Sequence, residues 1–133
     1  MTPHLLPIRV YYEDTDFSGV VYHASYLRFM ERGRTEQIRA LGVEQAELFD
    51  GDTPLVFVVR RMAIDWLRPA RMDDMLTVET VPTVARGASL ELRQRILRGE
   101  EELVTADVTV ACVGGGKARR IPEGLRRRLR LEG

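Results

Sequence analysis

The sequence is short of several residue types, and each shortage excludes a class of protein. A single cysteine, Cys112, allows neither an intrachain disulfide nor a metal site built from cysteines. No apolar run approaches the roughly 18 residues that a membrane-spanning helix needs. Residues 1–7 lack a basic region followed by an apolar stretch, so we expect no signal peptide and a cytoplasmic location. The 20 basic and 20 acidic residues cancel, which argues against a general binder of nucleic acids or other polyanions.

What remains is the composition of an ordinary globular protein. A chain of 133 residues, 44% hydrophobic and 30% charged, suits one domain with one core, residues 1–133. Cys112 lies in a strand-like apolar run, residues 108–113, where we expect a buried thiol. A small protein with no net charge also has little electrostatic protection against self-association.

The hydrophobic pattern predicts one long helix and five strands. Spacings of three and four residues indicate an amphipathic helix from His23 to Leu41, ended by Gly42. Strands joined by short loops pair antiparallel, and the helix must cover one face of their sheet. We therefore expect an α+β fold in which edge-to-edge pairing of two copies removes one exposed edge from each. The predicted strands are residues 8–13, 55–67, 75–84, 88–97 and 103–113; shorter helical segments are predicted at 43–52 and 122–131.

Two features of the predicted helix are unusual. Gly33 lies in its middle, at a cost of about 1 kcal/mol relative to alanine, and close packing against another element is the usual reason. Neither Tyr22 nor His23 is a favoured N-cap, although Ser25 could cap a helix that starts later. If the helix does start at His23, its first N–H groups are left for another group to satisfy.

Acidic residues crowd the segment before this helix. Glu13, Asp14 and Asp16 fall within four positions and repel one another, so a purely structural segment gains little from them. A turn signal at Gly19 and then His23 follow. A carboxylate beside the free N–H donors of a helix N-terminus can bind and attack a carbonyl.

Three stretches carry a resemblance to a known family: residues 9–16, 19–26 and 31–36, supported by 69–74 and 120–123. They closely resemble the hot-dog-fold acyl-CoA thioesterases of the 4-hydroxybenzoyl-CoA thioesterase-like family, in particular the small bacterial branch associated with the Tol–Pal operon. The resemblance implies a long central helix wrapped by a five-stranded antiparallel sheet. It implies dimers or homotetramers with the active site at the dimer interface, no metal, and no cofactor beyond the CoA of the substrate. Acyl carrier protein is a further possible partner.

The resemblance assigns Asp16, the second acid of the Asp-x-Asp pair, as the catalytic residue. A carboxylate is ionised at neutral pH, so Asp16 could attack the thioester directly or activate a water molecule, and the sequence does not choose. The backbone N–H of His23 is the matching donor for the oxyanion. The His23 side chain could position substrate or bond to its own chain, and Tyr22 could line the acyl pocket or pack.

The resemblance places CoA against Arg86, Gly87 and Ser89, between two strands, although for Arg86 alone a solvated surface role is the plainer reading. We expect short aliphatic or aromatic acyl groups. The alternatives are a hot-dog dehydratase of hydroxyacyl thioesters and a non-catalytic scaffold or carrier-binding module. Among the other charged residues, we expect Asp14 to orient its loop, Asp73 and Asp74 to form a turn, and Glu31 to pair with Arg34 on the helix.

Overall fold

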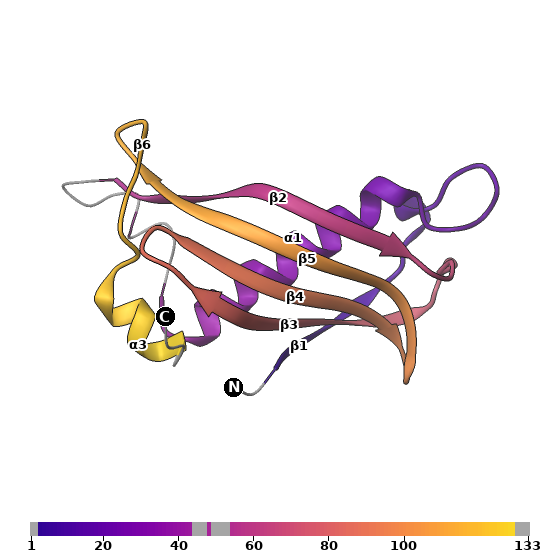
Figure 1. Ribbon diagram of the computed structural model, residues 1–133. Coiled ribbons are helices and arrows are strands. Elements are labelled where there is room, and N and C mark those ends of the chain that lie inside the picture. The colour runs from indigo at the N-terminus through magenta and orange to yellow at the C-terminus, as the bar shows by residue number, and fades with distance from the viewer. Residues whose placement is uncertain (1–2, 44–47, 49–53, 130–133) are drawn as a thin grey trace.

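A curved antiparallel sheet wraps one long helix in the computed structural model, which describes residues 3–43, 48 and 54–129 (Figure 1). The predicted α+β arrangement is confirmed, whereas most of the helical segment predicted over residues 43–52 lies outside the described residues. The elements are β1 (His4–Arg9), the 3-10 turn η1 (Tyr12–Asp14), α1 (His23–Ala40), β2 (Val56–Trp66), β3 (Met75–Ala85), β4 (Ser89–Arg98), β5 (Glu101–Gly114), β6 (Lys117–Ala118) and α3 (Glu123–Leu129).

The strand order is β1-β3-β4-β5-β2, with the short β6 paired to β5. Strands β3, β4 and β5 follow one another as antiparallel hairpins, as predicted. The expectation is wrong for β2, which is followed by β3 in the chain but pairs along its length with β5. The connection over residues 67–74 can extend to about 28 Å, and only about 14 Å separates strands three places apart in a sheet. The connection is therefore long enough to cross.

The first strand ends earlier than predicted. It runs from His4 to Arg9 along β3 and contains Pro7, which has no amide hydrogen. The predicted end of the strand instead forms η1, because the Asp14 carboxylate accepts a hydrogen bond from the Tyr11 amide at 2.8 Å. Local bonding by an aspartate thus competes with the strand ladder.

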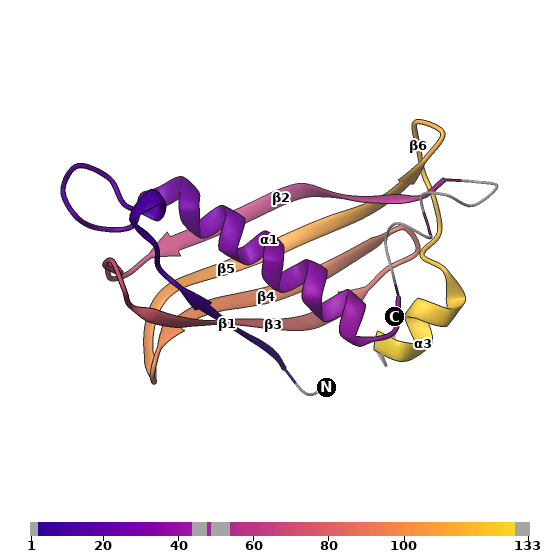
Figure 2. The same cartoon turned by 180° about the vertical axis from the view of Figure 1, so that it is seen from behind.

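Helix α1 crosses the inner face of the sheet, which Figure 2 shows from the helix side. Its residues Tyr26, Phe29 and Met30 are buried against inward-facing strand residues such as Leu76 and Val104. Cys112 is fully buried on the same face, as predicted, and burial raises the pKa of its thiol.

Gly33 lies where α1 and the sheet come closest. A Cβ atom at this position would meet Cγ1 of Val78 at 2.6 Å and Oγ1 of Thr80 at 3.1 Å. Real side chains do not approach this closely, so only glycine allows α1 to sit at its observed depth. The predicted reason for a glycine in the middle of the helix is confirmed.

The two ends of α1 differ in how they are capped. The helix starts at His23, with Tyr22 as an N-cap that makes no side-chain bond. Ser25 does not cap a later start, because its Oγ donates to the Asp14 carbonyl at 3.1 Å from inside the first turn. The helix ends at Ala40, and the predicted stop, Gly42, follows two residues later with a φ of +84° that suits glycine. Within the described residues, no helix has the length and apolar character required to traverse a lipid bilayer.

Candidate active site

The two aspartates of the acidic segment have different roles. Asp14 is buried, its carboxylate caps the preceding turn, and its carbonyl accepts the Tyr22 amide at 2.9 Å. It thereby fixes the loop against the start of α1, which confirms the prediction that Asp14 orients the loop. Asp16, two residues later, projects from the loop into solvent in the single chain.

A tight turn holds Asp16. Its Oδ1 accepts hydrogen bonds from the Ser18 amide at 2.8 Å and the Ser18 hydroxyl at 2.6 Å. The turn closes where Gly19, with φ of +85°, donates its amide to the Asp16 carbonyl at 3.0 Å. The Val20 amide gives the carboxylate a further, weaker backbone hydrogen bond, and the side chain stays exposed in the single chain.

The surroundings of Asp16 favour its charged form. The hydroxyl and then the amide of Ser18 lower the pKa of the carboxyl, with smaller contributions from the Val20 amide and from the charge of His23. Hydrogen bonds that an ionised carboxylate accepts stabilise it relative to the protonated acid. At neutral pH Asp16 is therefore an anion, as either a nucleophile or a general base must be.

The first amides of α1 lie close by. No backbone or side-chain oxygen among the described residues accepts a hydrogen bond from the amides of His23 or Ala24. Open amides at a helix start carry partial positive charge and can bind an oxyanion. The start without a side-chain cap, noted as unusual in the sequence, therefore leaves two donors available near an anionic carboxylate.

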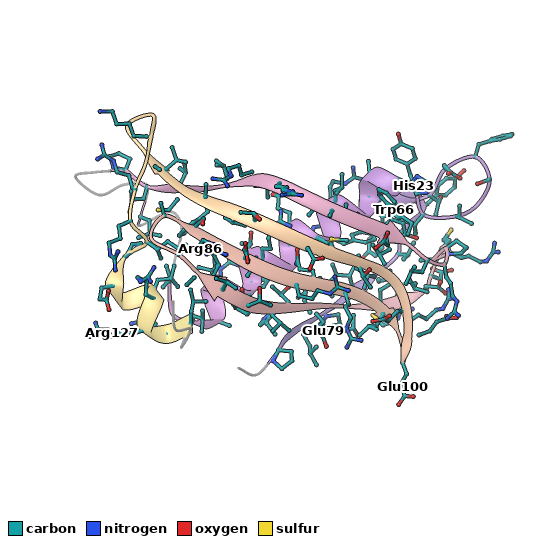
Figure 3. All side chains as sticks on the ribbon, viewed as in Figure 1. His23, Trp66, Glu79, Arg86, Glu100 and Arg127 are labelled. Atoms are coloured by element: carbon teal, nitrogen blue, oxygen red, sulfur yellow. The ribbon has the colours of Figure 1, made fainter. Side chains whose placement is uncertain are left out.

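The His23 ring lies against β2. It stacks on the Trp66 indole with 4.7 Å between ring centroids and an angle of 36° (Figure 3). Both rings border a cavity of about 170 Å³ between the start of α1 and the end of β2. Trp66 was not anticipated as a neighbour, because the pairing that brings β2 here is between strands distant in the sequence. Tyr22, proposed for the acyl pocket, is 55% exposed and does not line this cavity.

The residues predicted to contact CoA lie elsewhere. Arg86, Gly87 and Ser89 form the turn between β3 and β4, where the Arg86 amide donates to the Ser89 carbonyl at 2.8 Å. Figure 3 shows Arg86 at the opposite end of the sheet from His23. The length of β4, about 30 Å at some 3.3 Å per residue, separates the two ends. Within one chain, the turn predicted to bind CoA and the residues predicted to be catalytic therefore lie at opposite ends of the sheet.

The predictions made for the other charged residues have different outcomes. Asp73 and Asp74 form the predicted turn, in which Asp74 Oδ2 accepts from the Arg71 amide at 2.9 Å. The predicted pair of Glu31 with Arg34 is not formed, since Arg34 turns inward and donates to Gln94 Oε1 at 3.1 Å. In the part of the chain that the structure describes, no three His, Cys, Asp or Glu side chains gather as metal ligands would.

Comparison with known proteins points to the thioesterases. Residues 18–105 match the thioesterase superfamily. The acyl-CoA thioesterase YbgC of Haemophilus influenzae is 49% identical over 113 residues, covering 85% of this chain and 82% of that protein. A crystal structure described as a probable thioesterase from Bartonella henselae has a TM-score of 0.88 and 48% identity, covering 91% of this chain and 100% of that one. A Thermus thermophilus thioesterase complexed with coenzyme A and zinc has a TM-score of 0.82 and 26% identity, covering 95% and 90%.

Proposed function

Because the chain belongs to the thioesterase superfamily, we propose that it hydrolyses acyl-CoA thioesters to a free acid and CoA. The observation that carries the proposal is an exposed, ionised Asp16 in the loop that leads into the unbonded first amides of α1. A thioester carbonyl needs these two groups together, an anion to attack it and a donor for the charge that develops on its oxygen.

Two routes are consistent with this placement. In one, a carboxylate oxygen of Asp16 attacks the carbonyl carbon, CoA leaves as the thiolate, and water hydrolyses the resulting mixed anhydride. In the other, Asp16 takes a proton from a water molecule, which attacks in its place. In both, the His23 amide holds the oxyanion, and loss of one such donor typically costs 100- to 1000-fold in rate. The imidazole of His23, fixed by Trp66, orients the substrate or the water.

We propose that a second copy of the chain completes the site. Strand β2 is an unpaired edge on which Val56, Val58 and Val59 are each 38–44% exposed. An antiparallel pairing of β2 with the same strand of a partner buries these valines and continues the sheet. The twofold axis of that pairing reverses the partner, so its Arg86 turn lies near the start of α1. Arg86, Gly87 and Ser89 of the partner subunit then face the CoA phosphates, and two such dimers make the proposed homotetramer.

The proposed substrates carry short aliphatic or aromatic acyl groups on CoA, with acyl carrier protein as a second possible carrier. The reaction needs only a carboxylate and water, so we propose no cofactor beyond the CoA of the substrate. Activity that survives dialysis against EDTA supports this point, and activity restored only by an added metal contradicts it. The proposed cytoplasmic location and Tol–Pal association rest on the sequence resemblance, and the genes that flank this one test the association.

A thiol-release assay over a panel of acyl-CoA substrates tests the proposed activity. The wild-type oligomer is expected to release CoA from at least one member, and Asp16→Ala to lower kcat/KM by roughly 1000-fold or more. Asp107→Ala, which removes an exposed aspartate of β5, is the matched control and should retain activity. Circular dichroism and size-exclusion chromatography confirm that both variants remain folded and assembled.

The same variants discriminate the alternatives. A scaffold is favoured if the folded oligomer releases no CoA from any panel member but still binds acyl carrier protein. A dehydratase with another base is favoured if Asp16→Asn keeps full hydratase activity on a hydroxyacyl thioester.

A further inference from the structure

A second cavity opens on the edge of the sheet formed by β2. It has a volume of about 310 Å³ and lies between the second half of α1 and strands β2, β4 and β5. Its walls combine apolar side chains, among them Ile38, Phe57 and Leu92, with the polar side chains of Glu31 and Thr35. Val59 also lines it and belongs to the exposed β2 edge, so the cavity reaches the surface where we place the partner. Pairing of β2 strands brings Asp16 of the partner subunit to this end.

One basic side chain, Arg34, lines this cavity. Its Nη1 donates to Gln94 Oε1 at 3.1 Å. Gln94 is fully buried and held in turn, because its Nε2 donates to the Met30 carbonyl at 3.0 Å and to Thr80 Oγ1 at 2.9 Å. The amide of Gln94 fits here because Gly33 has no side chain, since a Cβ would lie 3.3 Å from Nε2. The position of the guanidinium is thus set by the packing of the helix.

The guanidinium of Arg34 has more donors than the protein uses. An arginine carries five N–H donors, and within the described chain only Gln94 accepts from this one. Glu31 lines the same cavity and attracts Arg34, although no ion pair forms between them and no other described carboxylate pairs with the guanidinium. Partial burial lowers the pKa of Arg34, which reflects the cost of holding its charge away from water. Buried donors without acceptors are costly, and an oxygen atom on a ligand would satisfy them.

We propose that this cavity receives the acyl group and that Arg34 selects acyl groups bearing an oxygen acceptor, a hydroxyl or a carboxylate. The inference rests on the proposed thioesterase function and deepens it, because it names the substrate class. The cavity volume is near the lower end of ligand pockets, about 300–1,000 Å³, which suits a short acyl chain. The apolar walls take the carbon chain, and the free N–H groups of Arg34 bind the oxygen.

Three four-carbon substrates of equal length test the proposal: butanoyl-CoA, 3-hydroxybutanoyl-CoA and succinyl-CoA. The wild-type oligomer is expected to favour at least one of the oxygenated substrates over butanoyl-CoA by about 10- to 100-fold in kcat/KM, the range of a charge-assisted hydrogen bond. Arg34→Met should reduce that ratio to below about threefold. Arg32→Met, on the same helix but outside this cavity, is the matched control and should keep the wild-type ratio.

The outcomes separate this inference from the proposed function. Equal efficiency on all three substrates, or a preference that Arg34→Met retains, overturns the role of Arg34 and leaves the thioesterase proposal standing. Release of CoA from none of these or other thioesters overturns both. Where Arg34→Met does not fold, Arg34→Lys carries the test. Its non-planar head cannot bond Gln94 and a ligand in one fork, so it should give an intermediate ratio, and an unchanged ratio contradicts the proposal.

Discussion

The start and the middle of α1 differ in how their polar groups are hydrogen-bonded. In the middle, Gly33 lets the helix approach the sheet, and the buried Gln94 amide bonds to Met30, Thr80 and Arg34. At the start, the His23 amide lacks an acceptor within the described chain. Satisfied and buried bonds make the middle a source of stability.

The unbonded groups at the start of α1 have the opposite effect on stability. The open amides and the exposed Asp16 carboxylate contribute little to stability, but a reacting carbonyl can use them. Substitutions at the start should therefore change rate more than stability, and substitution of Gly33 itself the reverse.

Mixed dimers should give the largest effect. They test whether Asp16 of one protomer and the cavity beside α1 of the other protomer form one active site. Asp16→Ala removes the carboxylate, and Leu92→Trp fills the cavity beside α1. Each variant alone should be nearly inactive. Co-purified heterodimers carrying different affinity tags should recover about half of the wild-type activity, since one of the two sites has neither substitution.

The control for this experiment is a mixture of the two homodimers that is assayed before subunits exchange, and it should stay inactive. Inactive heterodimers would show that each site is built within one chain, and they would remove the role proposed for the partner.

Gly19→Val should slow the reaction while leaving most of the fold intact. The φ of +85° at this position is strained for a β-branched residue, at a cost of about 1–3 kcal/mol. The turn that aims Asp16 should therefore distort, and we expect kcat to fall by roughly 10- to 100-fold. Steady-state kinetics and thermal unfolding of the same preparation measure both effects. An unchanged kcat would mean that the geometry of this turn does not limit catalysis.

Gly33→Ala should destabilise the protein, and Gly124→Ala provides the comparison. Both are helix glycines, but a Cβ at Gly124 would meet nothing within 4 Å. Alanine there should add up to about 1 kcal/mol of stability. The clash with Val78 should make Gly33→Ala less stable than Gly124→Ala by about 1–3 kcal/mol. Denaturant unfolding measures the difference, and equal stabilities would contradict the close packing described above.

The smallest effect concerns pH. Ser18→Ala removes the hydroxyl that contributes most to lowering the pKa of Asp16 but keeps the amide bond. The pKa of Asp16 should therefore rise toward its ordinary value. Because the reaction needs the ionised carboxylate, the acidic limb of the kcat/KM profile should move to higher pH, with little change at neutral pH. An acidic limb that stays in place would indicate that another group controls it.

Local signals in the sequence predicted the features that depend on neighbouring residues. The mid-helix Gly33, the stop at Gly42 and the buried strand thiol of Cys112 each follow from the chemistry of one residue in its segment. The Asx-type turn at Asp16 could also have been anticipated, since a serine follows it by two residues.

Features that depend on distant pairing were not predictable in this way. The crossing connection puts β2 beside β5, and the stack of His23 on Trp66 follows from that pairing. The inward turn of Arg34 depends on Gln94, which is 60 residues away in the chain. Spacing along the helix favoured Glu31 as its partner, whereas a buried amide across the core proved a better acceptor.

Pro7 in β1 has a consequence for how large an assembly can grow. Among the described long strands, β1 then forms the outer edge of each half of a dimer joined through β2. Each copy of β1 lacks an amide hydrogen at Pro7, so a further strand that docks there finds an interrupted ladder. Extension of the sheet at β1 is therefore disfavoured, and with it the open-ended stacking that leads to fibrils.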